Sequence, residues 1–518
     1  PLQTTLRQFE EADNFGSLIR PDVSDVDGML RILESKNVSG QLFISMTHQK
    51  VLQALRQADY LIPKYHVVIA NPPYMGAKGM NGRLGAWVKD NYPSSKSDLF
   101  STFIERGLEL VPRYGYSAMV TMQSWMFLSS FESLRSKLIC QTAIESMAHM
   151  ANMVMGIAFG TVATIWKVGG SMSVKGSYCY VEYEDIGAGN RPNTFPPHNE
   201  RNQRAKNEGW FYRAAIADFK KIPGCPIAYW APAGVIKGFE SFDTLKEFAI
   251  PSQGMATTNN DLFLRQWHEC GNENLIFPQK VNPDTRKIGK WFACNKGGPL
   301  RKWYGNNNIV VNYENDGKSI CDYIDNTPNV RVKSNGRVIN RDKYFQPGTT
   351  WSTLSSSGFS MRFTPPGYAF ETKGAMCFPG SLESAYFLTA LGCSKVIDYL
   401  LKFISPTMDY HEGPLGRLPI APVDRSRVLP LATAAIKSAI HDWDFFETSW
   451  DFTSLPLLNP DYRQPTLKAT YQKLRAHWRE MTLEMQRLEQ ENNRIFIDAY
   501  GLQDELDEKV DLNEITLT

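Results

Sequence analysis

The stretch His66-Val67-Val68-Ile69-Ala70-Asn71-Pro72-Pro73-Tyr74 decides the fold of the first part of this chain. Its apolar and β-branched residues predict a buried parallel strand over 66–70. The polar-proline-proline-aromatic corner that follows predicts that the strand ends there. Two consecutive prolines fix the backbone angle φ, so we expect this corner to be rigid.

Elements around the corner predict a parallel sheet. A helix is expected at 47–61, and Ser97 or Asp98 stands ahead of an apolar stripe of helical spacing that ends near 111. A turn then leads into a strand at 116–122. Strand, loop, helix and strand in this order form a right-handed βαβ unit, so the fold class is α/β.

Three further strands are expected before residue 184. One is a short strand at 144–148, and the residues at 161–168 alternate as in an antiparallel strand. The segment 173–183 is expected to pair with 161–168 as a hairpin across Gly169-Gly170.

The corner residues suit the binding of an exocyclic amine. Such an amine is a poor nucleophile because its lone pair is delocalised into the ring. The Asn71 side-chain oxygen and the Pro72 carbonyl would accept its two hydrogens and draw that lone pair out of conjugation, and Pro73 helps to hold them still. Tyr74 offers a flat face on which an extruded base can stack. The alternative is a proline turn that only ends a core strand.

Composition bounds the class of protein. The 518 residues are 42% hydrophobic and 12% aromatic, which indicates several globular domains. A net charge of +2 means that nucleic acid would have to bind at local patches. The eight cysteines have no metal-ligand spacing, so we expect no metal and a reducing, cytoplasmic location. No apolar run is long enough to span a membrane.

Several motifs together resemble the γ-type adenine-N6 DNA methyltransferases, and most closely the PglX methyltransferases of BREX phage-defence systems. In chain order, the motifs that carry the resemblance are the Asn71–Tyr74 corner, Ser97-Asp98-Leu99-Phe100, the Gly115 strand, Trp125, Phe131-Glu132 with Leu134-Arg135, and Phe159-Gly160. The resemblance implies part of a Rossmann-like class I methyltransferase sheet and S-adenosyl-L-methionine as cofactor. Asn rather than Asp at the start of the corner implies an adenine target.

The resemblance also implies two aromatic roles. Phe159 matches the second aromatic that encloses the flipped adenine opposite Tyr74, and Phe103 matches an aromatic that touches the adenine ring of the cofactor. The alternatives are a core Phe at a strand entry and a core Phe of a helix stripe.

One departure from the γ pattern concerns the cofactor. The glycine-rich cofactor loop should precede the corner, and residues 1–65 contain no such loop. The Gly-x-Gly within 185–189 is followed by prolines that cannot begin a helix, so we interpret it as linker. We therefore expect the cofactor half to lie upstream, in a longer protein of which this chain is an internal part.

The composition changes along the chain predict four regions. They are a methyltransferase catalytic half at 1–183, a linker at 184–205, a mixed α/β target-recognition domain at 206–425 and a helical region at 426–518. The helical region has a heptad-like seam from Leu467 to Ile495 and is expected to form an antiparallel hairpin or to meet another protein.

A local basic excess marks the expected recognition domain. Between residues 280 and 343, thirteen Lys or Arg residues face six Asp or Glu residues. Basic residues contact phosphates, so this segment predicts a DNA-binding region, although a merely solvated basic face is the alternative. The candidates are Lys287, Lys290, Arg301, Lys302, Lys333 and Arg337.

These observations lead to one hypothesis and two rivals. The hypothesis is site-specific adenine-N6 methylation of double-stranded DNA by base flipping and direct methyl transfer, in a BREX-like system with other BREX proteins as partners. One rival is a restriction-modification fusion enzyme whose nuclease domain lies outside this chain. The other is a DNA-reading defence scaffold without methyl transfer.

Overall fold

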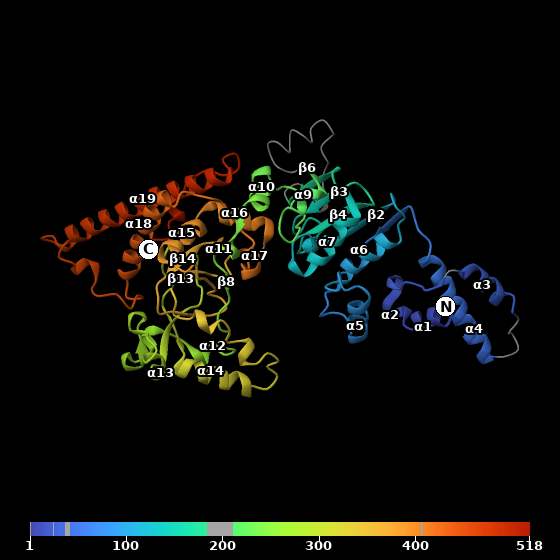
Figure 1. Cartoon of the computed structure of the whole chain (residues 1–518), viewed down its shortest axis with the longest axis horizontal. Helices are drawn as coiled ribbons and strands as arrows, with labels where there is room; N and C mark the ends of the chain where they lie inside the picture. Colours follow the sequence, from blue (N-terminus) through green and yellow to red (C-terminus); the bar gives the residue numbers. More distant parts are fainter. Residues whose placement is uncertain (1, 24, 37–41, 184–210, 406–407, 518) are drawn as a thin grey trace. The chain divides into compact units, whose positions relative to one another are not determined.

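The computed structural model describes residues 2–23, 25–36, 42–183, 211–405 and 408–517. The chain forms two compact units, Pro1–Ala231 and Pro232–Thr518 (Figure 1). Within the described ranges, no helix is both long and apolar enough to cross a lipid bilayer.

The first unit is built on a mixed six-stranded sheet with the strand order β1-β2-β4-β3-β5-β6. β1 and β2 are parallel and are connected through α6, which confirms the predicted α/β class and its βαβ unit. The strands are β1 (Val67–Ala70), β2 (Tyr116–Met122), β3 (Thr142–Met150), β4 (Thr161–Val168), β5 (Lys175–Val181) and β6 (Phe211–Ala215).

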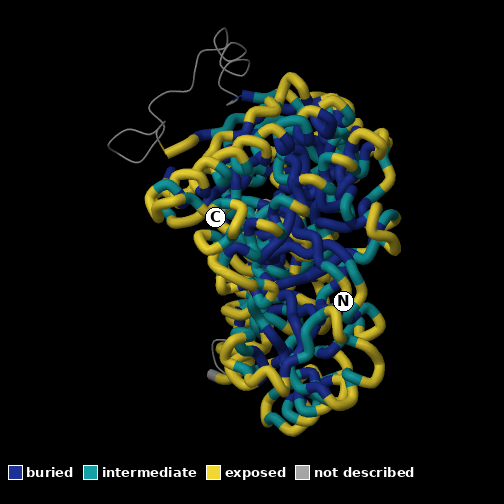
Figure 2. The backbone as a smooth tube through the Cα atoms, turned by 90° about the vertical axis from the view of Figure 1, so that its left-hand side faces the viewer, coloured by how far each residue is buried: buried dark blue, intermediate teal, exposed yellow. Residues whose placement is uncertain are grey.

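Helices cover one face of this sheet and form the main core of the unit. Apolar side chains of α6 and α7 pack against β2, β3 and β4. Figure 2 colours the buried residues of the whole chain dark blue. Gly107 lets α6 approach β2, because a Cβ at this position would lie 2.3 Å from Met119 Cε. The helices of the unit are α1 (Leu2–Gln8), α2 (Ala12–Phe15), α3 (Val26–Glu34), α4 (Leu42–Leu61), α5 (Gly82–Asn91), α6 (Leu99–Glu109), α7 (Glu132–Gln141) and α9 (Ile216–Phe219).

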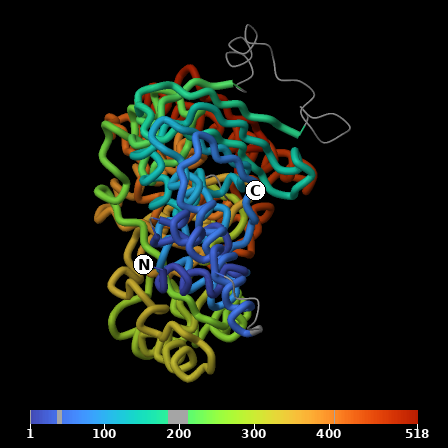
Figure 3. Tube along the Cα trace, turned by 90° about the vertical axis from the view of Figure 1, so that its right-hand side faces the viewer, coloured from blue at the N-terminus to red at the C-terminus, as the bar shows by residue number. Residues whose placement is uncertain are grey.

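A second core joins the N-terminal helices. Apolar residues of α1 to α5 pack together and against the start of α6; the chain can be followed through them from its blue end in Figure 3. The helix expected at 47–61 is present as α4 and begins five residues earlier.

The prediction that strand 66–70 is buried is wrong for this chain. Among the described residues β1 pairs only with β2, so it is an edge strand. Val67 is 53% exposed and Ile69 is 78% exposed. Both side chains belong to the sheet face opposite to α6 and α7, and no described helix covers them there.

The predicted hairpin between 161–168 and 173–183 is also wrong. Both edges of β4 are occupied, by β2 and β3, so β5 cannot pair with it. β5 instead lies parallel to β3 and antiparallel to β6.

The boundary between the units differs from the predicted one. Residues 211–231 were expected in the recognition domain, but β6 completes the sheet of the first unit, which extends to Ala231. The reason is that β5 has a free edge, which β6 covers. The predicted linker 184–205 lies outside the described residues.

The second unit contains a five-stranded sheet, a four-stranded sheet, a two-stranded sheet and many helices. The five-stranded sheet has the order β10-β11-β12-β9, with β15 (Ala369–Phe370) paired to β11, and the four-stranded sheet has the order β14-β13-β16-β8. The strands are β7 (Asp243–Thr244), β8 (Pro251–Ser252), β9 (Leu264–Gln266), β10 (Leu275–Ile276), β11 (Trp291–Asn295), β12 (Ile309–Asn312), β13 (Gly348–Trp351), β14 (Met361–Thr364), β16 (Met376–Cys377) and β17 (Pro419–Ile420).

The helices of this unit are α10 (Ala233–Ser241), α11 (Leu245–Phe248), α12 (Asn260–Phe263), α13 (Thr285–Ile288), α14 (Glu314–Asn326), α15 (Leu382–Gly392), α16 (Lys395–Ile404), α17 (Glu412–Gly416), α18 (Arg425–Asp444) and α19 (Leu467–Tyr500). The predicted helical tail is the pair α18 and α19, which pack on each other. α19 also contacts α15 and α16, so the tail is integrated into the second unit. In its seam, Leu467 and Tyr471 are exposed and Trp478 and Met481 are half-buried, whereas the buried members are Leu474, Met485, Leu488, Asn492 and Ile495.

Candidate active site

The Asn71-Pro72-Pro73-Tyr74 corner lies at the carboxyl end of β1. Asn71 and Pro73 are exposed, Pro72 is buried and Tyr74 is half-buried. The carboxyl ends of the parallel strands β1 and β2 meet at this edge of the sheet. In open α/β sheets this is the edge where ligands bind.

Tyr74 is anchored on the helix-covered side of the sheet. Its hydroxyl donates to the Val120 carbonyl at 3.2 Å, and its ring meets the Phe100 ring edge-on with centroids 6.0 Å apart. Burial raises the pKa of the Tyr74 hydroxyl, so it remains a neutral donor. The orientation of this ring is therefore set by β2 and α6.

Asp98 ties the corner to α6. Its side chain caps the helix: Oδ1 accepts hydrogen bonds from the Phe100 amide at 3.3 Å and from the Met75 amide at 2.9 Å. In return, the Leu99 amide donates to the Met75 carbonyl at 3.0 Å. Burial raises the pKa of the Asp98 carboxyl, while the amide donors act to lower it. Both backbone groups of Met75, the residue after Tyr74, are thus hydrogen-bonded to the first residues of α6 and its cap.

This second function of Asp98 was missed in the sequence. The Ser-Asp pair ahead of an apolar stripe indicated a helix cap. Nothing in that pattern indicates that the same carboxylate also reaches Met75, 23 residues earlier in the chain.

The structure brings Phe159 to Tyr74. Phe159 lies just before β4, and β4 begins beside the end of β2, with Thr161 paired to Met122. The Tyr74 and Phe159 ring centroids are 6.0 Å apart at an interplanar angle of 61°. Phe159 is 37% exposed, so one side of this aromatic pair is open to solvent.

Phe103 lies on α6, one turn beyond Phe100. It is half-buried and packs against both the sheet core and the N-terminal helical core. These contacts account for the buried part of its side chain.

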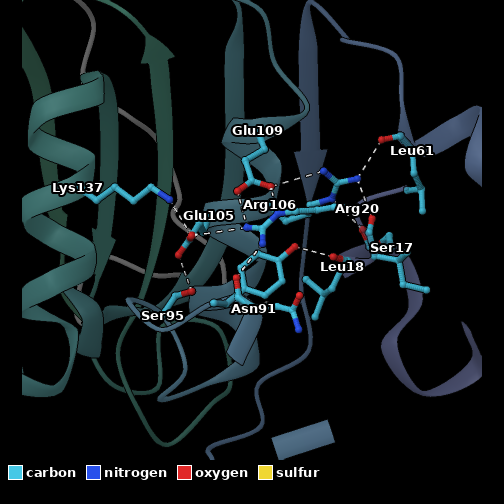
Figure 4. Close-up of polar contacts among 12 residues, drawn as sticks. Ser17, Leu18, Arg20, Leu61, Asn91, Ser95, Glu105, Arg106, Glu109 and Lys137 are labelled. Carbon is cyan, nitrogen blue, oxygen red and sulfur yellow. Dashed lines mark hydrogen bonds and ion pairs between the residues drawn. The ribbon is translucent and has the colours of Figure 1, made fainter. Parts of the chain in front are cut away.

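A buried arginine fastens the N-terminal segment to α6 (Figure 4). Arg106 donates to three backbone carbonyls, those of Ser17 at 3.1 Å, Ile19 at 3.0 Å and Leu61 at 2.9 Å. Burial is the largest influence on the Arg106 guanidinium and lowers its pKa. Since one side chain satisfies three carbonyls, the turn after α2 and the end of α4 are both fixed to the helix that follows the corner.

A second arginine extends this network. Arg20 donates from Nε to Glu109 at 2.7 Å and from Nη1 to the Asn91 carbonyl at 2.7 Å. Its guanidinium lies 3.9 Å from the centre of the Tyr92 ring. The fully buried Tyr92 donates in turn to the Leu18 carbonyl at 2.5 Å. Arg106 and Glu109 of α6 therefore bind the segment around residues 17–20 to the helix that packs on the sheet (Figure 4).

The face of the sheet opposite to α6 and α7 carries an apolar hollow of about 440 Å³. It is lined mainly by small and β-branched side chains of β1 to β4. Among them are Ile69, Ala118, Val120, Ala148, Ala163 and Ile165. Small side chains of this kind allow another element to pack closely on a sheet.

The predicted DNA-binding residues fall into two groups in the second unit. Arg301 donates to Asp442 at 2.5 Å and is 12% exposed, and Lys302 donates to Glu489 at 2.7 Å and is 15% exposed. The Trp303 indole also donates to Glu489, at 2.9 Å. Carboxylates of α18 and α19 thus pair with both charges inside the fold, and the expectation that Arg301 and Lys302 contact phosphates stays a prediction.

The other four candidates lie nearer the surface. Lys287 and Lys333 are exposed, and Lys290 and Arg337 are half-buried. The Lys333 ammonium donates to the Asp325 carbonyl, and the Arg337 guanidinium donates to a neighbouring backbone carbonyl.

Comparisons with known proteins show which families the chain is similar to. The family model of the Eco57I restriction-modification methylase matches residues 34–154, which include the corner. The chain is 35% identical over 465 residues to the adenine-specific methyltransferase BrxX of Escherichia coli O9:H4 (strain HS), covering 88% of this chain and 36% of BrxX. It is 34% identical over 526 residues to the adenine-specific methyltransferase PglX of Lacticaseibacillus casei (strain Zhang), covering 98% of this chain and 42% of PglX.

A solved structure of the Type IIL restriction-modification enzyme MmeI in complex with DNA is a more distant match. It has a TM-score of 0.44 and 13% sequence identity, over 85% of this chain and 57% of that one. The sequence comparisons confirm the predicted resemblance: nearly the whole chain is similar to the adenine-specific methyltransferases BrxX and PglX, and it spans about two fifths of their length.

Proposed function

We propose that this chain is the target-base-binding part of an adenine-N6 DNA methyltransferase. One observation carries the proposal: the fold places Phe159 against Tyr74, the last residue of the corner, although 85 residues separate the two rings in sequence. The similarity to two adenine-specific methyltransferases supports the choice of base.

The corner binds the amine of an extruded adenine. The Asn71 side-chain oxygen and the Pro72 carbonyl accept the two hydrogens on N6. As N6 forms its new bond to carbon, these two acceptors stabilise the positive charge that develops on the nitrogen. One N6 proton then leaves to solvent, so no enzyme nucleophile is required.

The aromatic pair opens to admit the base. In the present geometry the Tyr74 and Phe159 rings touch edge to face, so a base stacks between them only after they separate. Tyr74 is anchored to the Val120 carbonyl and packed on Phe100. Phe159 is more exposed and follows a loop, so we expect Phe159 to move.

S-adenosyl-L-methionine, when bound, supplies an electrophilic methyl group. Phe103 is the residue of this chain proposed to contact it, and its half-buried position on α6 leaves part of the ring available. Ahead of β1, the described ranges contain no Gly-x-Gly turn after a strand. We propose that the rest of the intact protein completes the cofactor site beside β1, whose outer edge and exposed Ile69 offer backbone and apolar contacts.

We propose that the substrate is double-stranded DNA in the cytoplasm and that the intact protein acts with other BREX proteins. In the second unit, Lys287, Lys290, Lys333 and Arg337 remain the candidates for phosphate contacts. Contacts of this kind position the duplex and do not read its sequence.

The test is Asn71→Ala in the intact protein, with N6-methyladenine in DNA measured by mass spectrometry. Loss of a group that stabilises developing charge lowers a rate by roughly 100-fold to 1,000-fold. DNA affinity should change by less than about twofold, since most affinity comes from phosphate contacts.

Asn513→Ala, at an exposed asparagine of the second unit, is the matched control and should keep full activity. If Asn71→Ala methylates DNA at the normal rate, the site assignment is wrong. If the unaltered protein binds DNA and methylates no adenine, the DNA-reading scaffold is the better hypothesis.

A further inference from the structure

Gln123 lies beside the aromatic pair and has no part in the mechanism above. It follows β2 directly, and its amide N–H donates to the Gly160 carbonyl at 3.1 Å. The side-chain amide lies flat against Gly160: a Cβ there would be 2.4 Å from both Cδ and Oε1 of Gln123. A side chain at 160 would displace the Gln123 amide, which is therefore adjacent to the residue that follows Phe159.

A hydrogen-bonded chain leads from Gln123 into the core. His149 Nε2 is 2.6 Å from Gln123 Oε1, and His149 Nδ1 is 3.0 Å from the Tyr229 hydroxyl. His149 is 5% exposed and Tyr229 is also buried. Burial lowers the pKa of His149 to about 4 and raises that of Tyr229 well above its ordinary value, so both are neutral at neutral pH.

Because His149 and Tyr229 are neutral, the direction of the two hydrogen bonds of His149 can be assigned. A neutral imidazole carries one N–H, and Gln123 Oε1 can only accept, so His149 is protonated on Nε2. His149 Nδ1 is then a bare acceptor, and the Tyr229 hydroxyl donates to it. Oε1 of Gln123 is thereby engaged with His149, and Nε2, the donor end of the amide, has no hydrogen-bond acceptor among the described residues.

Aromatic rings keep the histidine in place. Tyr180 lies 5.0 Å from the His149 ring centre, Phe127 lies 6.1 Å away and Trp230 lies 6.3 Å away. With these neighbours the imidazole has little freedom to rotate. The amide of Gln123 is consequently preset before any base arrives.

We propose that Gln123 reads the extruded base by donating from Nε2 to one of its ring nitrogens. The proposal rests on the function proposed above and deepens it. Adenine offers only acceptors on its ring nitrogens N1, N3 and N7, whereas guanine carries a hydrogen on N1. A fixed N–H donor such as Gln123 Nε2 therefore matches adenine. If it binds N1, it excludes guanine without the use of a charged group.

The experiment is a double-mutant cycle between Gln123 and the ring nitrogens of the target. The intact protein and its Gln123→Leu variant are given duplexes with adenine, 1-deazaadenine, 3-deazaadenine or 7-deazaadenine at the target position, and kcat/KM for methyl transfer is measured. We expect one analogue to lower the kcat/KM of the unaltered protein by roughly 3-fold to 10-fold, the usual value of one hydrogen bond. That effect should vanish in Gln123→Leu, while the other two analogues act equally on both proteins.

A second variant separates a hydrogen bond to the base from the packing of residue 123 on Gly160. Gln123→Glu has the same shape, still accepts from His149 and still packs on Gly160, but it has no amide donor. It should lose the same coupling as Gln123→Leu. Gln57→Leu, at an exposed glutamine of α4, should keep the coupling of the unaltered protein.

The proposal would be overturned if each analogue had the same effect on the unaltered protein and on both Gln123 variants. This holds even if the variants lose overall activity, because a residue that only positions Phe159 shows no coupling to one ring atom. A retained coupling in Gln123→Glu would also overturn it. An unaltered protein that methylates no adenine duplex would refute the proposed function, and this inference with it.

Discussion

The Asn71–Tyr74 corner and the basic segment of the second unit differ in how much their sequence says about their chemistry. At the corner, four consecutive residues carry the proposed amine acceptors and one proposed stacking face, and the two prolines constrain their backbone. In the basic segment, thirteen cations are spread over 64 residues, and two of the six proposed DNA contacts are neutralised internally. A compact motif keeps its chemistry wherever the fold places it, whereas the use of a charge depends on its neighbours.

The largest expected effect tests whether Lys302 is structural. Lys302→Met leaves Glu489 buried without its cation and should lower the free energy of unfolding by about 3–5 kcal/mol, measured by urea denaturation. Adding Glu489→Gln to this variant removes the buried charge, retains an acceptor for Trp303 and should recover most of the loss.

Lys287→Met is the matched control for Lys302→Met, because the Lys287 side chain is exposed. It should change stability by less than about 0.5 kcal/mol. Equal destabilisation by the two lysine variants would remove the distinction between the two groups of cations.

A smaller effect sharpens the description of the corner. Asp98→Ala removes the cap of α6 and the acceptor for the Met75 amide, and it should cost about 1 kcal/mol of stability. A displaced corner should also lower the rate of DNA methylation by roughly tenfold.

Asp98→Asn keeps an oxygen in the same place and should retain most of both properties. Unchanged methylation by a folded Asp98→Ala protein would show that the corner is rigid through its prolines alone.

The smallest effect concerns one exposed cation. Lys287→Gln should weaken DNA binding by a few-fold and reduce the slope of log affinity against log salt concentration by about 1, because one phosphate contact is lost. The measurement is a salt titration of DNA binding by fluorescence anisotropy. Lys468→Gln, at an exposed lysine of α19, is the control; identical slopes for the two variants would exclude Lys287 from the interface.

Much of the fold around the corner was predictable because it depends on local preferences. The strand before Asn71, the cap at Asp98 and the parallel β1-α6-β2 unit all follow from spacings within a few residues. The pairing of β5 with β3 was not predictable in this way. A short glycine connection favoured a hairpin, but both edges of β4 were already taken.

The candidate site was also predictable only where local motifs define it. Asn71, Pro72, Pro73, Tyr74 and Phe159 were identified from motifs, and the structure shows the two rings in contact. Gln123 and His149 carry no sequence signal, because each is an ordinary residue at the end of a strand. Their link exists only because β2, β4 and β3 are neighbours in the sheet.

The sequence by itself determined the rigid Asn71–Tyr74 corner, the helix that follows it and the α/β class, because backbone constraint and apolar periodicity act over a few residues. Only the tertiary structure decided which cations are neutralised, where the Gln123 amide is fixed and which face of the sheet is open. The partners in these interactions lie far apart along the chain: Lys302 and Glu489 are separated by 187 residues. Local sequence cannot encode a contact whose geometry exists only after the intervening chain has folded.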